Sequence, residues 1–210
     1  MKSDTKDLFS LKYYHASLTD EDLELIKSSI DLDPKLVNAL TEGTWQQECK
    51  TSFPNFLETE DYKNGTGNTV LDVKNFSEIV LKHFDEYVKL ATKSKKYFQL
   101  ELMHSWLNKY NKGDSQEPHH HASPFTNFSG CIFLNFNKEK DAKFYFYDEN
   151  VIHLNQWYSE LFFGDTDKIY PDISQGDIIL FPSTSWHGVK RQKESTNRTT
   201  LSFNFKVQAL

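Results

Sequence analysis

The period of the hydrophobic pattern changes near residue 97, and this change restricts the folds open to the chain. Before it, apolar residues recur at helical spacing in two stretches, which predict helices over about 20–30 and 76–92. After it, residues 98–108 alternate between apolar and polar side chains, as in a strand. Further short strands are expected at 129–136, 142–147, 178–181 and 198–205. Helices followed by short strands predict a mainly β fold, an antiparallel jelly-roll barrel with N-terminal supporting helices.

Start signals accompany both expected helices. Ser17 and Thr19 precede the first as candidate N-caps, and acidic residues fill its first turn. Asn75 and Glu78 have the spacing of a capping box before the second helix. His83 lies on the apolar stripe of that helix, so we expect it to pack in the core.

Length and composition favour one integrated domain. The 210 residues suffice for a sizeable core, and 17 Phe and 10 Tyr favour strands. Residues 1–97 are expected to form an N-terminal helical and loop support region, with a short strand at 8–14 and mostly loop at 40–72. Residues 98–210 form the expected catalytic β core. The net charge of −6 argues against capture of nucleic acid through its phosphates, so no nucleic-acid partner is expected.

The sequence also favours a soluble, cytoplasmic protein. No apolar run reaches the roughly 18 residues of a membrane span, and residues 1–10 lack the order of a signal peptide. Cys49 and Cys131 lie far apart, and so few cysteines are usual in a reducing compartment. We therefore expect buried thiols rather than a disulfide, and no membrane partner.

Three consecutive histidines, His119, His120 and His121, are the main sign of chemistry. In extended backbone His119 and His121 share one face and His120 takes the other, so the first two supply half a metal site. His187 follows the apolar strand expected at 178–181 and would supply the other half. An iron(II) oxygenase needs such ligands on one side of the metal, with open positions opposite.

Arg198 points to a carboxylate ligand for the same site. After His187 the chain is expected to reverse direction in a turn and return along the neighbouring strand, where Arg198 lies. From there its guanidinium could bind a carboxylate in bidentate fashion. Thr200 faces the same way and adds a hydroxyl, and Asn108 is a further candidate to line the pocket. A dicarboxylate that chelates iron at one end and meets Arg198 at the other is 2-oxoglutarate.

The order of several short motifs gives a family resemblance over roughly residues 100–206. They are Trp106-x-Asn108, the turn at Gly113, the histidine segment, Ser129-Gly130, Gly176-Asp177-x-x-x-Phe181-Pro182, His187-Gly188-Val189 and Arg198-x-x-x-Ser202-Phe203-Asn204. In this order they resemble a family of 2-oxoglutarate- and Fe(II)-dependent oxygenases that is related to prolyl hydroxylases and common in marine bacteria and their phages. The resemblance implies a double-stranded β-helix, the cofactors Fe(II), 2-oxoglutarate and O2, and hydroxylation of a second substrate with release of succinate and CO2. The resemblance also allows an enzyme that is encoded by a virus and acts in the cytoplasm of the host.

The register of the histidines leaves the ligand set open. The wider superfamily has His-x-Asp/Glu where this family often reads His-x-His before Ser-Gly. An ungapped alignment would make His121 a ligand with Ser123 second, whereas a two-residue insertion pairs His119 with His121, which we prefer because both are competent imidazoles. Carboxylates that could substitute are Asp114, Glu117 and Asp148.

Two other functions remain open on these residues. The lack of a well-placed carboxylate also fits an inactive jelly-roll binding or scaffold protein. Three histidines would equally suit a cupin-type metalloenzyme that does not use 2-oxoglutarate. For the oxygenase, the primary substrate is a peptide, such as a prolyl side chain, or a small molecule.

Overall fold

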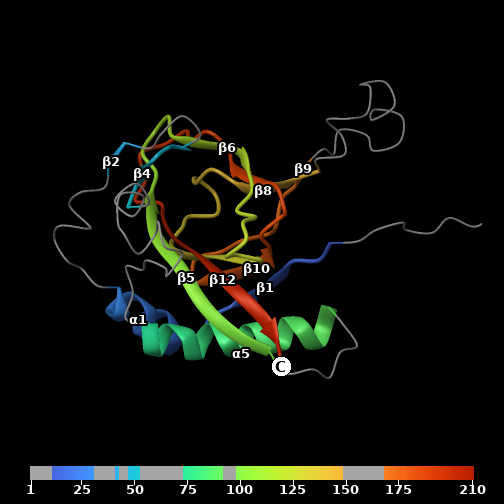
Figure 1. Ribbon diagram of the computed structural model, residues 1–210. Coiled ribbons are helices and arrows are strands. Elements are labelled where there is room, and N and C mark those ends of the chain that lie inside the picture. The colour runs from blue at the N-terminus through green and yellow to red at the C-terminus, as the bar shows by residue number, and fades with distance from the viewer. Residues whose placement is uncertain (1–10, 31–40, 43–46, 53–72, 92–97, 149–167) are drawn as a thin grey trace, which may run out of the picture.

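Two antiparallel sheets face each other and enclose the core of the protein (Figure 1). This architecture comes from a computed structural model, which describes residues 11–30, 41–42, 47–52, 73–91, 98–148 and 168–210. The arrangement is the double-stranded β-helix, so the expected jelly-roll is confirmed.

The larger sheet has seven strands. In spatial order they are β1 (Tyr14–Ser17), β10 (Asp177–Pro182), β7 (Phe128–Asn135), β12 (Thr199–Ala209), β5 (Phe98–Lys109), β4 (Lys50–Thr51) and β2 (Thr41–Glu42). β12 lies at the centre and pairs along its length with β5 and β7. Strands distant in sequence are thus neighbours in this sheet.

The smaller sheet has five strands. In spatial order they are β3 (Gln47–Glu48), β6 (Ser115–His119), β11 (His187–Val189), β8 (Phe144–Tyr147) and β9 (Lys168–Ile169). β11 lies between β6 and β8, with His187 opposite His119 on one side and Phe146 on the other. This register brings the two histidine motifs side by side.

Two helices cover the outer face of the larger sheet (Figure 1). α1 spans Asp20–Ser29 and α5 spans Val73–Ala91. Thr19 caps α1, because its hydroxyl accepts a hydrogen bond from the Asp22 amide at 3.1 Å. On α5, Phe76 meets the ring of Phe203 from β12 edge to face at 5.0 Å. Among the described residues, no helix has the length and apolarity needed to cross a bilayer.

Alternation along the central strands divides the core into two layers. Leu201, Phe203 and Phe205 of β12 point to the helices and are buried among residues of α1 and α5. Thr200 and Ser202, and Arg198 directly before the strand, line the pocket inside the barrel instead. A period of two therefore gives β12 one apolar face for stability and one polar face for a site.

Several expected boundaries were wrong. The first strand begins at Tyr14, not residue 8, because pairing with β10 runs only from Tyr14 to Ser17; residues 8–10 lie outside the described part. α5 begins at Val73, so Asn75 lies inside the helix and not at its start. The N-terminal region supplies β1 to β4 as well as helices, whereas most of the loop expected at 40–72 lies outside the described residues.

Other expectations are confirmed. Both cysteines are buried free thiols. His83 packs in the core between α5 and β1, where its ring lies 3.0 Å from the Tyr14 hydroxyl. The strands expected at 98–108, 129–136, 142–147, 178–181 and 198–205 correspond to β5, β7, β8, β10 and β12.

Candidate metal and cosubstrate site

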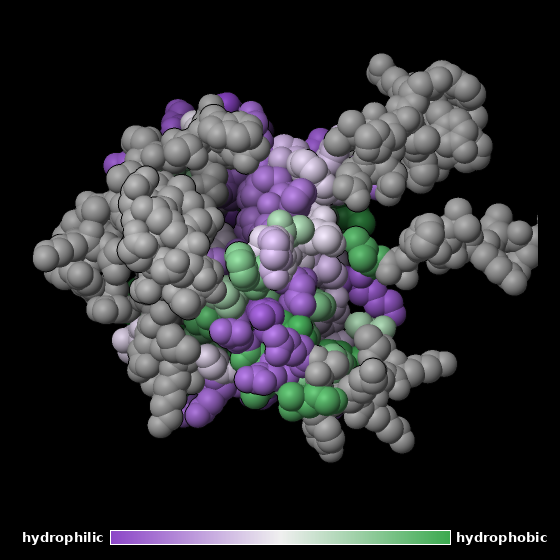
Figure 2. All heavy atoms as spheres, viewed as in Figure 1, coloured by the Kyte–Doolittle hydropathy of each residue, from purple (hydrophilic) through white to green (hydrophobic). Residues whose placement is uncertain are grey.

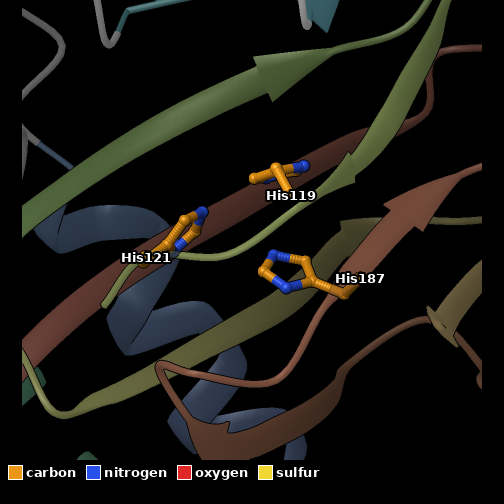
Figure 3. Close-up of side chains that lie close together, drawn as sticks. All are labelled: His119, His121 and His187. Carbon is orange, nitrogen blue, oxygen red and sulfur yellow. The ribbon is translucent and has the colours of Figure 1, made fainter. Parts of the chain in front are cut away.

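Three imidazoles converge inside the mouth of the barrel (Figure 3). His119 ends β6, His187 begins β11 opposite it, and His121 lies two residues beyond β6. One ring nitrogen from each lies within 4.8 Å of the other two. The chain thus brings together, from distant segments, three ligand atoms that could hold one metal ion.

Hydrogen bonds orient all three rings in the same sense. Nδ1 of His119 lies 2.7 Å from the Glu117 carbonyl, Nδ1 of His187 lies 2.9 Å from the Ser185 carbonyl, and Nδ1 of His121 lies 3.0 Å from Oδ1 of Asn204. Each partner is an acceptor, so each Nδ1 carries the proton and donates it. Every Nε2 then keeps its lone pair, which is the form that binds a metal.

A chain of polar side chains supports His121 from behind. Asn204 Oδ1 also accepts the Ser129 hydroxyl at 2.8 Å, and the Ser129 oxygen lies 2.8 Å from the hydroxyl of Ser183. Because Ser129 donates to Asn204, Ser183 donates to Ser129. The backbone of the ligand is held as well, since the His121 amide donates to the Ser183 carbonyl at 2.9 Å.

Burial keeps the three rings neutral in the metal-free protein. Desolvation, the larger cause, and the neighbouring His119 together lower the pKa of His121 to about 3. The pKa of His187 lies well below its ordinary value for the same reasons, burial first, and burial also lowers the pKa of His119. Neutral imidazoles need not lose a proton before they bind a cation.

Arg198 is the only cation among the residues that line the described pocket. It is 1% exposed, and its guanidinium carbon lies 3.9 Å from the centroid of the Tyr110 ring. Burial raises the pKa of Tyr110 well above its ordinary value, so this neighbour is a neutral phenol. Two guanidinium nitrogens, Nε and one Nη, are buried without a hydrogen-bond partner. A buried cation with unused donors is the expected state of an anion site before its ligand arrives.

One pocket joins the arginine to the histidines. Its walls include all three histidines, Arg198, and polar and apolar residues of the barrel interior. The others are Trp106, Asn108, Tyr110, Gln116, Gly130, Cys131, Phe144, Phe181, Val189, Thr200 and Ser202. No carboxylate occurs in this set. Thr200 and Ser202 of β12, with Arg198 directly before the strand, give this wall its polar side chains. Asn204, further along β12, is the partner of His121.

The structure does not bring the other candidate ligands to the histidines. Ser123 is exposed, and its hydroxyl lies 2.8 Å from that of Thr126 in a tight turn. The Asp114 carboxylate accepts the Asn111 amide at 2.7 Å within its own turn. Glu117 and Asp148 are exposed and lie outside the histidine group. Proximity in sequence does not bring these side chains to the histidines, because strand register decides which side chains meet.

Some pocket residues escaped sequence reasoning. Tyr110 continues the alternation that contains Trp106 and Asn108, so it could have been placed on the same face. Gln116, whose Oε1 accepts the Tyr110 hydroxyl at 2.6 Å, had no such signal. His120 is exposed as expected, with its ring 5.0 Å from that of Trp186.

Comparisons with known proteins give a family match and a shared fold. The family model described as "Putative 2OG-Fe(II) oxygenase" matches residues 104–204. None of the curated proteins compared with the chain matched it. A match to an oxidoreductase of the 2OG-Fe(II) oxygenase family from Burkholderia pseudomallei, at 13% identity and a TM-score of 0.44, covers 63% of this chain and 57% of that one.

Two further solved structures share the fold along most of the chain. A prolyl-4-hydroxylase from Pseudomonas putida aligns over 94% of this chain and 93% of its own, with 10% identity and a TM-score of 0.53. HygX from Streptomyces hygroscopicus, solved with nickel, 2-oxoglutarate and hygromycin B, aligns over 93% of this chain and 82% of its own, with 11% identity and a TM-score of 0.55. In its double-stranded β-helix and its match to the family model over residues 104–204, this chain is similar to the 2OG-Fe(II) oxygenases.

Proposed function

We propose that the protein is a 2-oxoglutarate- and Fe(II)-dependent dioxygenase whose metal ligands are His119, His121 and His187. The observation that carries this proposal is the unpartnered guanidinium of Arg198 in the same pocket as the three imidazoles. The residues fit both groups: three lone pairs for a divalent ion, and a buried cation for the distal carboxylate.

The charge of the pocket supports an anionic cosubstrate. All three proposed ligands are neutral, so a divalent ion would keep its double charge, and Arg198 adds another. No lining residue of the described pocket is an acid that could offset them. A dicarboxylate offsets two of these three charges, which favours 2-oxoglutarate over a neutral ligand.

Each residue then has a distinct task. The histidines hold the ion through Nε2, and Arg198 binds the distal carboxylate, with the Thr200 hydroxyl as a further donor beside it. Asn108 donates to Ser202 at 3.2 Å and has its carbonyl oxygen buried without a partner. With the amide turned over, the NH2 group would take the place of this unpartnered oxygen and would be available to donate to the cosubstrate. Phe144, Phe181 and Val189 exclude water.

When bound, Fe(II) and 2-oxoglutarate supply the oxidising chemistry: O2 is consumed, 2-oxoglutarate becomes succinate and CO2, and a C–H bond of the substrate becomes C–OH. The chain's own contribution is placement of these groups and exclusion of water. The primary substrate is a peptide side chain or a small molecule, because the fold is shared by a prolyl-4-hydroxylase and by a protein solved with hygromycin B. We further propose an intracellular site of action, consistent with two buried free thiols.

Anaerobic titration tests the proposal. Fe(II) followed by 2-oxoglutarate should produce a weak visible charge-transfer band in the wild-type protein and not in Arg198→Ala. Admission of O2 should then release succinate, even without substrate. An iron-loaded sample with neither band nor succinate would contradict the proposal.

The donor set also favours a second candidate, a three-histidine metalloenzyme that does not use 2-oxoglutarate. Its mark would be metal-dependent turnover that persists in Arg198→Ala without 2-oxoglutarate.

A further inference from the structure

Gln192 ties together three turns at the end of the barrel where β12 begins. It lies in the connection between β11 and β12, which has no strand structure between Lys190 and Arg198. Its backbone amide donates to the Asp114 carbonyl at 2.8 Å, and its carbonyl accepts the Gly113 amide at 2.8 Å. The connection is therefore fixed to the turn that follows β5.

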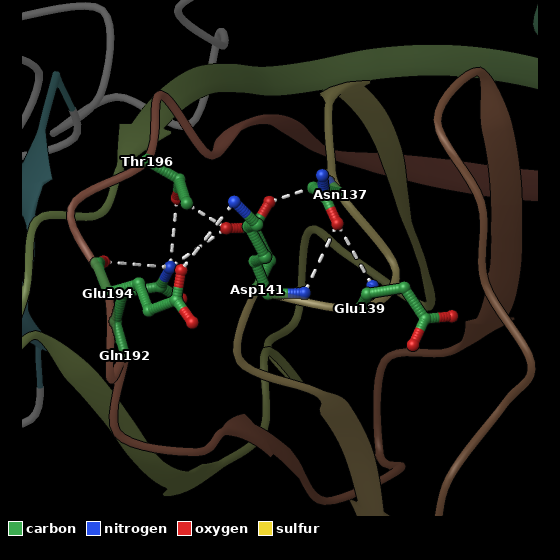
Figure 4. Close-up of polar contacts among 7 residues, drawn as sticks. Asn137, Glu139, Asp141, Gln192, Glu194 and Thr196 are labelled. Carbon is green, nitrogen blue, oxygen red and sulfur yellow. Dashed lines mark hydrogen bonds and ion pairs between the residues drawn. The ribbon is translucent and has the colours of Figure 1, made fainter.

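The side chain of Gln192, on a residue only 1% exposed, reaches the other two turns (Figure 4). Oε1 accepts the Ala142 amide at 2.7 Å, while Nε2 donates to Asp141 Oδ1 at 2.8 Å. Nε2 also lies 2.9 Å from Thr196 Oγ1 and 3.2 Å from the Glu194 carbonyl. Both polar ends of the amide are thus satisfied in the interior.

Asp141 is the second centre of this network (Figure 4). Oδ2 accepts the Asn137 amide at 2.7 Å, and Oδ1 accepts both the Gln192 amide and the Thr196 hydroxyl. The carboxylate is buried, so it depends on these donors for its solvation. Loss of any donor should loosen the turn that contains Thr196.

The network ends two residues before Arg198. The Arg198 carbonyl itself accepts the Tyr110 amide at 3.0 Å. Tyr110 belongs to the same short segment, 110–114, that binds the backbone of Gln192. The connection is therefore fixed at three points, residues 192, 196 and 198, although it has no strand ladder. These fixed points, with the strand β12 that starts at Thr199, determine where the backbone of Arg198 lies. The position of the backbone in turn determines where the guanidinium meets its ligand.

We propose that Gln192, together with Asp141, is a positioning residue that places Arg198 for the distal carboxylate of the cosubstrate. This inference rests on the proposed function. Gln192 lies outside the histidine group, and the hydrogen bonds of its side chain within the described residues go to the turns at 137–142 and 194–196. A change in the network should consequently alter affinity for 2-oxoglutarate and leave the metal site unchanged.

The first test replaces the amide with an apolar chain of similar length, Gln192→Met. Calorimetry on the anaerobic Fe(II) protein should give a roughly tenfold weaker Kd for 2-oxoglutarate, with the Kd for Fe(II) unchanged. The KM for 2-oxoglutarate should rise, whereas kcat at saturating 2-oxoglutarate should be unchanged. In the metal-free protein, hydrogen exchange should accelerate at the Ala142 amide, whose acceptor is lost.

An exchange of partners separates positioning from general damage. Gln192→Glu alone sets two carboxylates against each other, and the double variant Gln192→Glu/Asp141→Asn restores one donor and one acceptor. The single variant should lose affinity for 2-oxoglutarate and the double variant should regain most of it. Val80→Ala, a core truncation on α5, is the control for lost stability without lost affinity. If Gln192→Met does not fold, Thr196→Val removes one hydroxyl of the network and replaces it in the test.

The outcomes distinguish the two proposals. Wild-type protein that binds Fe(II) but not 2-oxoglutarate would overturn the proposed function. Wild-type protein that binds 2-oxoglutarate, beside a folded Gln192→Met or Thr196→Val variant with the same Kd, would overturn the positioning inference alone. A double variant no better than Gln192→Glu would overturn it too.

Discussion

The guanidinium of Arg198 is stacked on the ring of Tyr110, with 3.9 Å between the guanidinium carbon and the ring centroid. This contact stabilises a buried cation through the face of a neutral aromatic ring and leaves Nε and one Nη without a hydrogen-bond partner. An acid in place of Tyr110 would neutralise the arginine permanently. The stack therefore keeps the charge in place and available to an incoming carboxylate.

Arg198→Lys should impair cosubstrate binding although the charge is kept. The ammonium cannot bind a carboxylate in bidentate fashion and stacks less well on Tyr110. Loss of about 1.5–3 kcal/mol of charge-assisted hydrogen bonding corresponds to a roughly 10- to 100-fold weaker Kd for 2-oxoglutarate. Calorimetry with the anaerobic Fe(II) protein measures this. Equal affinities for both proteins would remove Arg198 from the cosubstrate site.

Removal of one proposed ligand should abolish tight metal binding, whereas removal of the middle histidine should not. His187→Ala and His121→Ala each leave two imidazoles in the group, while His120 is exposed and contacts Trp186. Metal content after dialysis against Fe(II) without oxygen should be near one ion for His120→Ala and near zero for the other two. Strong metal retention in His187→Ala would contradict the ligand assignment.

Asn204 should tune the metal site without touching the metal. It accepts the Nδ1 proton of His121 and the Ser129 hydroxyl, so Asn204→Leu frees the ring to turn and orphans both donors. Metal affinity should fall by roughly 10- to 100-fold, as for other supporting residues of metal ligands. Asn204→Asp keeps an acceptor and should retain affinity. A competition titration with a coloured chelator compares the two, and an unaffected Asn204→Leu would exclude the orienting role.

Gly130→Ala should destabilise the fold. A Cβ at this position would lie 2.4 Å from two ring atoms of Phe203 and 2.8 Å from a methyl of Leu180, both fully buried. Overpacking of this kind costs about 1–3 kcal/mol. A shift of the denaturant midpoint measures the change. The Phe203→Leu background, in which the ring is absent, should reduce the additional cost, and an unchanged cost would point to another cause.

His83 should make the protein less stable in mild acid. Tyr14 donates to Glu86 at 2.7 Å, so Nδ1 of His83 donates to Tyr14, and Nε2 is buried without a partner. Burial lowers the pKa of His83 below 6.5, with Lys82 adding to the effect. Below pH 6.5 the unfolded chain therefore binds a proton at His83 that the folded chain does not bind. The free energy of unfolding consequently decreases as the pH is lowered.

His83→Gln, which cannot titrate, isolates this effect. Relative to the variant, the wild-type unfolding free energy should fall by up to about 1.4 kcal/mol per pH unit between pH 6.5 and the folded pKa. Metal-free protein should be used for both, so that the other histidines contribute equally. Parallel stability curves for the two proteins would show that His83 binds its proton equally in both states.

Much of the scaffold could be read from periodicity, because alternation and helical spacing are local properties of burial. β5, β7, β10 and α1 lie within a few residues of their expected bounds. The ends of the strands differ more from the prediction. β12 was expected to end at residue 205 but continues to Ala209, because β5 pairs with it as far as Phe98. A strand ends where its neighbour ends, and the neighbour of β12 is remote in sequence.

The sequence by itself determined which side chains are available to the site. They are three histidines in two motifs and one arginine after the second motif, with no well-placed carboxylate. Only the tertiary structure decided that His119 lies opposite His187, that the nearby carboxylates stay outside, and that Arg198 rests on Tyr110 within a framework tied by Gln192. The reason is that side-chain type is local, whereas the meeting of side chains depends on strand register and on hydrogen bonds between turns far apart in the chain.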